Sequence, residues 1–503
     1  MSQSSLLQRL GLRAGAADSR LSWSIVALAL GLYVLGYVAF FPSGATVDDE
    51  DLYLEQTQLW LDTGSFRTDK LDPFTGQLEP FVPGNYPVGT IALMAPFSAA
   101  FGRPGGFLAS FLCLVLAVFV TARWLARERR SPLFALILLA FPAAAVAGRL
   151  AMSDTARTFT AAFGLWLFFR GLDGRRGWWL ASGFVAGAAL SLRESAVLPF
   201  IPLFAGALLR WERGWGWLLL GGLAGTALHL TANQAAFGSA FFVRGVQGYP
   251  LDLAIHTRLP LYLLGLLVLV PGGLWFGLCY RGRRRPELVA TVALFFAFYL
   301  FQAYGITESG FVKRLVVALR YFDPLLPVLA FTMAESLPRQ LDALLARFPG
   351  RRHLEALLAG AAVLWIAGAL TAAFAVHPVL GRWGAGQGSI RSTIEANVPR
   401  DVVLITNATA IRKFIDDLAR PYRTLWRHEL HEGDLPQLRE RHGGYLVAFL
   451  DRSDSEYWRL DAERNQAFLA QLPDAIQLVD LRVTASDRLR VWRVGEPRGA
   501  PSR

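Results

Sequence analysis

Residues 23–41 read WSIVALALGLYVLGYVAFF and contain no charged side chain. An α-helix needs about 20 apolar residues to cross the hydrocarbon core of a bilayer. The run follows Arg9, Arg13 and Arg20, as the apolar core of a signal peptide would, but it is too long for one, and many more apolar runs come after it. We therefore expect an uncleaved anchor and a chain that crosses the membrane repeatedly.

Comparable apolar runs recur as far as residue 376, whereas residues 377–503 have an ordinary mixed composition. Only 18% of the 503 residues are charged and 53% are hydrophobic, with a mean hydropathy of +0.36. About a quarter of the residues of a soluble domain are charged. The chain is therefore predicted to be a polytopic α-helical membrane protein, with about eleven transmembrane helices at 23–41, 104–122, 131–148, 156–169, 178–192, 196–209, 215–231, 258–280, 288–304, 322–337 and 356–376.

The net charge of +11 is distributed in a way that indicates membrane topology and not nucleic-acid binding. The basic residues form short clusters between apolar runs, and such loops face the cytoplasm. Residues 88–101 would reach only ~21 Å as a helix, and all five basic clusters fall on the cytoplasmic side only if this segment does not cross. We therefore expect a cytoplasmic N-terminus (1–22) and an extracytoplasmic C-terminus. The clusters are RWLARERR (123–130), RGLDGRR (170–176), RWERG (210–214), RGRRRPE (281–287) and PRQLDALLARFPGRRHLE (338–355).

These runs predict a transmembrane domain at 23–376 with an acidic first extracytoplasmic loop at 42–87, followed by a small extracytoplasmic α/β domain at 377–503. In this last part, the tail, residues 401–407 and 445–451 are predicted strands and residues 476–494 a hairpin, and helices are expected at 409–419 and 455–472. The tail has no Gly-rich phosphate loop and no metal-ligand spacing, so an accessory role is expected.

The strongest candidate for chemistry is VDDEDLYLEQTQLWLDTG (47–64), directly after the first span. Its leucines and aromatic residues recur at roughly helical spacing, and its acids fall where a helix N-terminus favours negative charge. The alternative is an acidic N-cap of an interfacial helix. One carboxylate would suffice for a cap, however, and four in succession (Asp48, Asp49, Glu50 and Asp51) indicate a functional site.

Three further segments place charge near the predicted outer membrane surface: GRLAMSDTAR (148–157), LSLRES (190–195) and LRYFDPLLP (319–327). Ionisable residues at membrane depth are functional candidates. For each segment a structural alternative stays open: a helix cap with an interfacial arginine pair, a turn with a local ion pair, and a snorkelling arginine.

One reaction that uses charges of both signs at a membrane surface is the transfer of a sugar from a lipid phosphate. It requires a carboxylate that accepts the proton of the acceptor hydroxyl. It also requires cations, or a metal, that stabilise the departing phosphate. The candidates for the first role are Asp48, Asp49, Glu50 and Asp154. The candidates for the second are Arg149, Arg193, Lys313, Arg314 and Arg320. His229 and His256 could ligate a divalent cation, but without fixed spacing a polar helix face or loop surface explains them as well.

These segments together resemble the GT-C class of membrane glycosyltransferases, in particular the branch of the protein O-mannosyltransferases and the lipid A aminoarabinose transferases. The resemblance covers most of residues 23–337 in order and leaves the tail outside. It rests on Asp49-Glu50 with Tyr53, NYPVGTIALMAPF (85–97), GRLAMSDTA (148–156), LSLRES, NQAAFGS (233–239) and RYFDPLLPVLA (320–330).

The resemblance implies an inverting transfer of a sugar from a polyprenyl-phosphate donor, with the acid of the Asp49-Glu50 motif as general base. It implies an enzyme of a bacterial inner membrane that works on its extracytoplasmic face, where membrane lipid surrounds it and the acceptor is an envelope glycolipid, polysaccharide or protein. It also implies juxtamembrane helices in the first loop. The substrate-binding residues expected on this basis are Tyr86, Arg149, Arg193, Asn233, Arg320 and Tyr321.

The sequence departs from the family pattern at two places. Val88 stands where a second proline is common, and the additional acids Asp48 and Asp51 leave open which carboxylate is the base. A transporter or flippase of lipid-linked sugars is the alternative function. Transporters tend to show internal repeats and interrupted helices near the midplane, and the two halves of this sequence show no convincing repeat. A membrane sensor would leave the acidic first loop unexplained.

Overall fold

The computed structural model describes most of residues 20–497, together with Leu7, Leu10 and Leu12. Lys313 and Arg314 lie outside the described residues, as do Asn85 and residues 408–416, which include most of the helix expected at 409–419, and the side chain of Asp48 is not described. The other residues outside the description are 1–6, 8–9, 11, 13–19, 43, 47, 84, 242–252, 254, 303–312, 315, 348–350, 454–455, 484–486 and 498–503.

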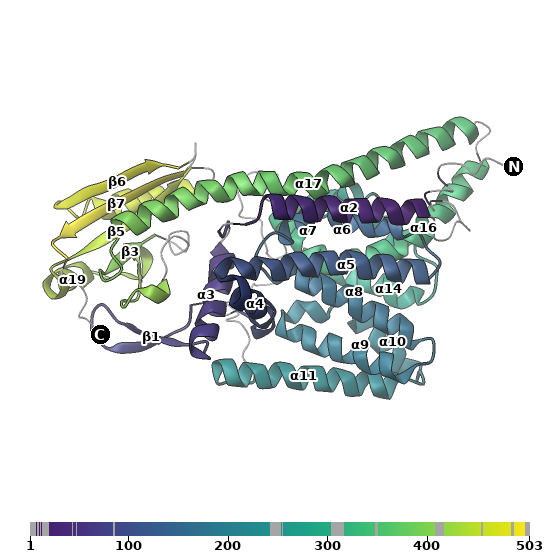
Figure 1. Ribbon diagram of the computed structural model, residues 1–503, viewed down its shortest axis with the longest axis horizontal. Coiled ribbons are helices and arrows are strands. Elements are labelled where there is room, and N and C mark those ends of the chain that lie inside the picture. The colour runs from purple at the N-terminus through teal and green to yellow at the C-terminus, as the bar shows by residue number, and fades with distance from the viewer. Residues whose placement is uncertain are drawn as a thin grey trace.

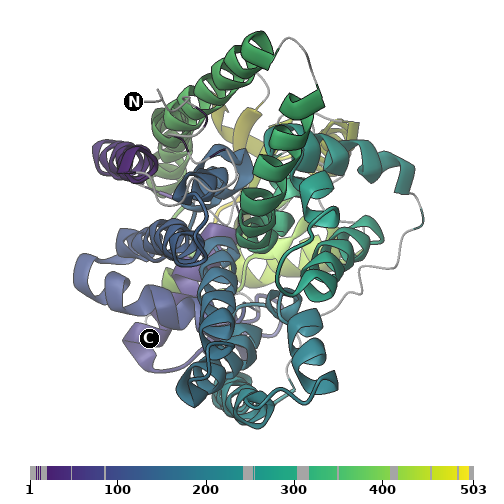
Figure 2. The same ribbon diagram turned by 90° about the vertical axis from the view of Figure 1, so that its right-hand side faces the viewer.

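A bundle of helices forms one part of the molecule, and a β-sheet with its own helices forms the other (Figure 1). Seen from the end of the bundle, the helices pack side by side, with α2 at the rim (Figure 2). The bundle helices are α2 (Arg20–Ala39), α5 (Phe107–Arg127), α6 (Ile137–Ala140), α7 (Pro142–Ala147), α8 (Asp154–Gly171), α9 (Arg176–Ala188), α10 (Ile201–Leu209), α11 (Trp215–Phe237), α12 (Ile255–Leu263), α13 (Gly273–Leu278), α14 (Arg285–Leu300), α16 (Leu326–Arg347) and the first part of α17 (Arg351–Asn397).

Four helical stretches of the described chain are long and apolar enough to cross a membrane, by length and composition. They are Arg20–Ala39, Arg103–Arg127, Val316–Arg347 and His353–Arg382. Of the other predicted spans, 215–231 forms the 23-residue helix α11 and 156–169 the 18-residue helix α8, and the rest form shorter helices. Two of the spans are clearly divided. The segment 131–148 breaks between Phe141 and Pro142, where α7 begins. Proline lacks the N–H that would continue a helix. The segment 258–280 divides into α12, a π-helical stretch at Leu264–Leu269 and α13.

Glycines explain why α9 and α11 pack so closely. Gly183 and Gly187 of α9 face Gly221 and Gly225 of α11, and a Cβ atom at any of the four would collide with a backbone carbonyl oxygen of the opposite helix. Each pair has the spacing of the small-residue motif by which membrane helices bring their backbones together. These small residues therefore determine the contact between the two helices.

The first loop after α2 is ordered into helices and a hairpin. Helix α3 (Asp48–Thr63) lies across the end of the bundle, at a steep angle to α2 and α5, and α4 (Val88–Phe101) packs beside it (Figure 1). Between them, β1 (Thr68–Leu71) pairs antiparallel with β2 (Leu78–Phe81). The helix predicted at 47–64 is confirmed, and residues 88–101 form a helix of only 14 residues.

The tail is a five-stranded sheet in the order β4-β3-β5-β7-β6. Ile390 and Ile394 of α17 pack against one face of the sheet, while Leu438 and Phe468, from two other helices, pack against the opposite face. Helix α17 therefore runs without interruption from the bundle to the tail, through the predicted boundary at residue 376. The tail elements are β3 (Leu404–Thr406), β4 (Leu425–Trp426), α19 (Asp434–His442), β5 (Gly444–Arg452), α20 (Glu456–Leu469), β6 (Ala475–Arg482) and β7 (Asp487–Gly495).

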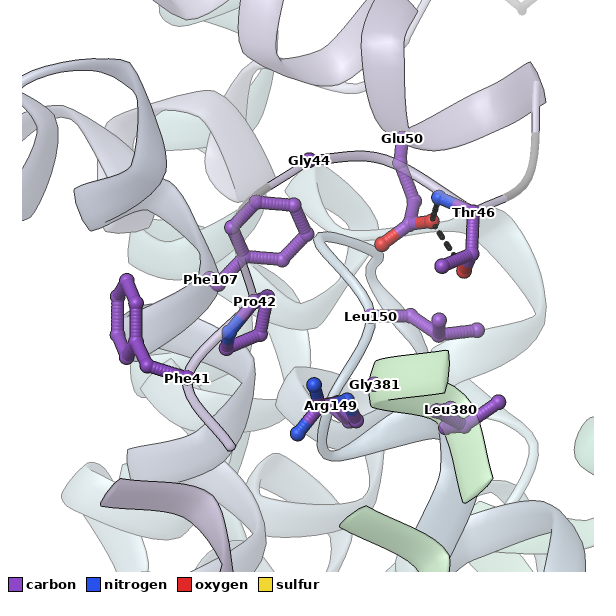
Figure 3. Close-up of a pocket in the computed structure, with 10 residues that line it drawn as sticks. All are labelled: Phe41, Pro42, Gly44, Thr46, Glu50, Phe107, Arg149, Leu150, Leu380 and Gly381. Carbon is purple, nitrogen blue, oxygen red and sulfur yellow. Dashed lines mark hydrogen bonds between the residues drawn. The ribbon is translucent and has the colours of Figure 1, made fainter. Parts of the chain in front are cut away.

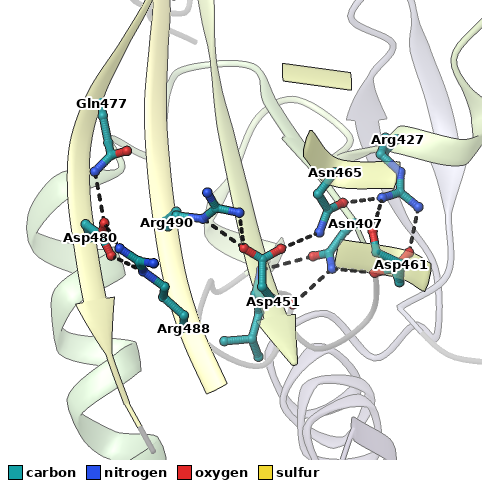
Figure 4. Close-up of polar contacts among 10 residues, drawn as sticks. Asn407, Arg427, Asp451, Asp461, Asn465, Gln477, Asp480, Arg488 and Arg490 are labelled. Atoms are coloured by element: carbon teal, nitrogen blue, oxygen red, sulfur yellow. Dashed lines mark hydrogen bonds and ion pairs between the residues drawn. The ribbon is translucent and has the colours of Figure 1, made fainter. Parts of the chain in front are cut away.

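A network of charged and amide side chains joins the strand ends of the tail to α20 (Figure 4). The Asp461 carboxylate accepts hydrogen bonds from Arg427 at 2.6 Å and from Asn407 at 2.8 Å. Asn465 donates to Asp451 at 2.8 Å, and Asp451 also accepts from Arg490. Because these buried groups satisfy one another, the network stabilises the fold of the tail.

Candidate active site

Asp49 lies in the first turn of α3 and is held by a tyrosine from beyond the hairpin. The Tyr86 hydroxyl donates a hydrogen bond of 2.7 Å to Asp49 Oδ1. The Tyr86 ring packs on Tyr53, one turn further along α3, with 4.0 Å between the ring centroids. The carboxyl group keeps about a third of its surface exposed. Asp49 is therefore fixed in orientation and still accessible, as a general base must be.

Glu50 is buried, unlike its neighbour Asp49. One carboxylate oxygen accepts hydrogen bonds from the Thr46 backbone N–H at 2.5 Å and its hydroxyl at 2.9 Å, and the other accepts from the Ala151 N–H at 2.9 Å. Glu50 also lines a small cavity with Arg149 (Figure 3). These contacts attach α3 to the turn before α8, so Glu50 has a structural role in the described geometry.

Asp51 is buried against the start of α5. Its Oδ1 pairs with Arg103 Nη2 at 2.7 Å, whereas its Oδ2 has no hydrogen-bond partner among the described residues. Burial raises the pKa of Asp51 to about 7, because the charged form is poorly solvated there and the Arg103 guanidinium compensates only in part.

The cation that faces Asp49 is Arg320, in the 3₁₀ turn Arg320–Leu325 before α16. Its Nη2 lies 3.9 Å from Asp49 Oδ2 and donates to the Tyr321 hydroxyl at 3.3 Å. Its Nε has no acceptor within the described part of the chain. The guanidinium of Arg193, between the short 3₁₀ turns Ala189–Ser191 and Glu194–Val197, lies 5.4 Å from the centre of the Tyr321 ring. The structure therefore brings Asp49, Tyr86, Arg193, Arg320 and Tyr321 together.

Asp154 lies behind these arginines. It forms a fully buried ion pair with Arg157, and Arg157 Nη1 donates to the Ser195 hydroxyl at 3.3 Å. Arg193 and Arg320 are near enough to interact electrostatically with Asp154. A carboxylate already paired with a buried guanidinium is a poor proton acceptor. Asp154 is therefore better suited to holding the arginines than to acting as the base.

Two of the residues predicted to bind substrate, Arg149 and Asn233, contact other side chains than those around Asp49. Arg149 Nη1 lies 3.4 Å from His377 Nδ1 of α17, on the side of the Figure 3 cavity. Asn233 is buried in α11, where its amide lies 3.2 Å from His229 Nε2 and 3.4 Å from the Ala240 carbonyl oxygen. His256 is exposed on α12. Within the described residues no three His, Cys, Asp or Glu side chains gather as a metal site would require.

Sequence reasoning missed two buried charged residues near this cluster. Arg258 is fully buried in α12, one turn before Tyr262, whose ring packs on Phe322 with centroids 4.9 Å apart. Asp323 is fully buried, interacts electrostatically with Asp154 and Arg320, and has no hydrogen-bond partner among the described residues. Both could have been found in the sequence as charged residues inside apolar runs, because such residues are rare in membrane helices unless they have a function.

Comparison with solved structures places this arrangement in a known fold. The chain is similar to ArnT from Cupriavidus metallidurans in the apo state, with a TM-score of 0.58 and 17% identity over 94% of this chain and 97% of that one. The form of that protein bound to undecaprenyl phosphate matches equally well, over 98% of its length. The chain has the GT-C fold. The resemblance to GT-C membrane glycosyltransferases that the sequence indicates is therefore confirmed.

Two further comparisons are consistent with the GT-C fold. A model of the dolichyl-phosphate-mannose-protein mannosyltransferase family matches residues 101–232. The oligosaccharyltransferase of Archaeoglobus fulgidus, tethered to an acceptor peptide, is similar with a TM-score of 0.50 and 12% identity over 85% of this chain and 69% of that one. No curated protein matches the chain by sequence.

Proposed function

We propose that this GT-C protein transfers a sugar from a polyprenyl-phosphate-linked donor to an acceptor of the cell envelope, with Asp49 as general base. The observation that carries the proposal is the pairing of opposite charges at one accessible place. Asp49 is fixed by Tyr86 at 2.7 Å and faces Arg320 at 3.9 Å. A sugar transferase of this type needs both a proton acceptor and a phosphate-binding cation at one site.

In the proposed reaction, Asp49 takes the proton of the acceptor hydroxyl while the oxygen of that hydroxyl attacks the anomeric carbon of the sugar. The bond between that carbon and the donor phosphate oxygen breaks, and its electron pair leaves with the phosphate. Arg320 and Arg193 stabilise the negative charge that develops on the polyprenyl phosphate. Attack from the face opposite the phosphate inverts the anomeric carbon.

The fold and one of its members support the choice of donor. ArnT from Cupriavidus metallidurans was crystallised with undecaprenyl phosphate. In this chain, two arginines and Tyr321 lie beside Asp49 at the end of the helical bundle, where a lipid phosphate group would stand. We propose that the sugar is a hexose or a pentose and that the acceptor is a glycolipid, polysaccharide or protein. The arginines supply positive charge toward this phosphate, and a divalent cation stays a possible addition to the site.

Comparative mass spectrometry of envelope lipids and glycans tests the proposal and identifies the substrate in the same experiment. Wild-type cells should contain a glycosylated species that is missing from cells lacking the protein. The purified protein in lipid nanodiscs should then form this species from the matching polyprenyl-phosphate sugar and the isolated acceptor. Identical envelope compositions, with no transfer by the purified protein, would count against a transferase. A changed envelope with no transfer by the purified protein would favour a flippase.

We also propose that the chain crosses the membrane about eleven times, with the tail outside the cytoplasm. Alkaline phosphatase fused after Arg503 should be active, and green fluorescent protein fused there should be dark. The same fusions made after Arg129, in a predicted cytoplasmic loop, should give the opposite result. A fluorescent fusion after Arg503 would overturn the orientation and the placement of the site with it.

A further inference from the structure

The hairpin of the first loop, β1 and β2, meets the edge of the tail sheet at one isolated β-bridge. The Leu71 N–H donates to the Pro421 carbonyl oxygen at 2.8 Å, and the Arg423 N–H donates to the Leu71 carbonyl oxygen at 3.0 Å. These two bonds make Leu71 a parallel bridge partner of Tyr422, three residues before β4 at the sheet edge. A segment of the membrane domain therefore pairs with the tail through its backbone.

Side chains strengthen this junction, which we call the hairpin clamp: residues 68–81 against residues 420–423, Arg441 and His442. Arg441 Nη2 donates to the Thr75 carbonyl oxygen at 2.6 Å, and Nη1 donates to that of Phe74. His442 Nε2 lies 2.6 Å from the Pro73 carbonyl oxygen. Each contact engages a carbonyl group in or beside the hairpin turn, so the turn is held along its length.

Apolar side chains of the hairpin also enter the tail. Leu71 and Phe74 pack against the hydrophobic cluster of the tail that contains Tyr422 and Leu438. Lys70 is buried, and its Nζ donates to the Arg420 carbonyl oxygen. The hairpin is therefore part of the core of the tail, although the sequence places it in the first loop of the membrane domain.

The tail reaches α3 at a second place. Arg391, on the part of α17 that packs beneath the tail sheet, is near enough to interact electrostatically with Asp51 of α3. Only residues 64–67 separate the other end of α3 from β1. The helix that carries Asp49 is thus linked to the hairpin by a short stretch of chain at its last turn, and its first turn lies near Arg391 of α17.

We propose that the tail is a positioning element of the Asp49 site, and that the hairpin clamp is the contact through which it holds α3 in place. This inference rests on the proposed function, because the clamp acts on catalysis through Asp49. Residues of the clamp touch neither Asp49 nor the space beside it, so they are positioning residues. A displacement of about 1 Å of a catalytic group can lower a rate by about 100-fold.

A double substitution, Phe74→Ala with Arg441→Ala, loosens the clamp with little risk to folding, because Arg441 is exposed and Phe74 is only half-buried. Arg439→Ala is the matched control: Arg439 lies on the same helix, is exposed, and pairs with Asp474 inside the tail at 2.6 Å. The clamp variant should lose about 10- to 100-fold in kcat with an unchanged KM for the donor. Arg441→Lys, which keeps a donor toward the turn, should recover most of the kcat that Arg441→Ala alone loses.

A spin-label distance provides a readout that does not depend on activity. Labels at Asp62→Cys on α3 and Leu116→Cys on α5, both exposed, would be introduced with Cys113 and Cys279 replaced by alanine. The distance distribution should be narrow in the wild-type background and in Arg439→Ala, and broad in the clamp variant.

The inference is overturned if the clamp variant keeps the kcat of the control, or if its distance distribution stays narrow. If the wild-type protein transfers sugar and the clamp variant transfers equally well, the proposed function stands and the positioning role fails. If no donor supports transfer by the wild-type protein, the proposed function fails, and the distance measurement alone decides whether the clamp holds α3.

Discussion

The charged side chains at Asp49 and those of the tail network differ in how completely they are paired. In the tail, Asp461 accepts hydrogen bonds from Arg427 at 2.6 Å and from Asn407 at 2.8 Å. At the site, Asp49 is one-third exposed and stands 3.9 Å from Arg320. Buried charges that satisfy one another define a fold, whereas partly exposed charges at longer distance can rearrange around a ligand. The same residue types therefore stabilise in one region and are suited to react in the other.

Replacing the carboxylate at the site should give the largest effect. Asp49→Asn should lower transfer by about 10²–10⁴-fold, the usual contribution of a positioned base. The fold should persist, because the amide oxygen still accepts the hydrogen bond from Tyr86. Asp62→Asn, an exposed acid of the same helix that accepts a hydrogen bond from Gln58, is the matched control. If Asp49→Asn transfers normally, Asp49 is not the base.

Substitutions in the tail network should lower the stability of the fold. Asp461→Ala leaves the Arg427 guanidinium buried without its carboxylate, and breaking a buried ion pair costs about 3–5 kcal/mol. Asp474→Ala removes a more exposed pair with Arg439 and should cost no more than about 1 kcal/mol. Thermal unfolding of both variants in the same detergent measures the difference. Equal melting temperatures would mean that the buried network contributes no more than a surface ion pair.

A smaller effect is expected from pH at Asp51. Its pKa is raised from 3.8 to about 7 by burial, so the folded state binds a proton that the unfolded state has already released. The stabilisation is fully present below pH ~4 and is lost as pH rises through about 7. Asp51→Asn should make the melting temperature depend less on pH in this window. Above pH ~7 the variant should melt at a higher temperature than the wild type. An unchanged pH dependence in Asp51→Asn would contradict the assignment.

Most bundle helices and the central strands of the tail could be predicted from the sequence because they depend on local patterns, whereas β1, β2, β4 and α19 were not predicted. Apolar runs gave the bundle helices, and the β-branched and aromatic runs at 401–407 and 445–451 correspond to β3 and β5. Helix α17 was harder to predict, since residues 377–397 contain Pro378 and several glycines and read as a linker. Packing of Ile390 and Ile394 beneath the sheet stabilises that part of the helix, which no local signal reveals.

The site could be predicted only to the level of its segments. Successive residues on a helix point about 100° apart, and this rotation alone makes Glu50 buried and Asp49 accessible. The sequence shows two adjacent acids and cannot say which face of α3 meets the bundle. The hairpin clamp was not predicted either, because its hydrogen bonds join the first loop to residues near the end of the chain.

Binding of a polyprenyl phosphate to the purified protein tests the central claim most directly, namely that Arg320 binds the donor phosphate while Asp49 serves the acceptor. Arg320→Ala should weaken binding by about 1.5–3 kcal/mol, roughly 10- to 150-fold. Asp49→Asn should bind at least as tightly as the wild type, because it removes a negative charge from the neighbourhood of the phosphate. Arg439→Ala, in the tail, should bind as the wild type does. If Arg320→Ala binds the lipid phosphate as tightly as the wild-type protein, the phosphate lies elsewhere and the account of the site is wrong.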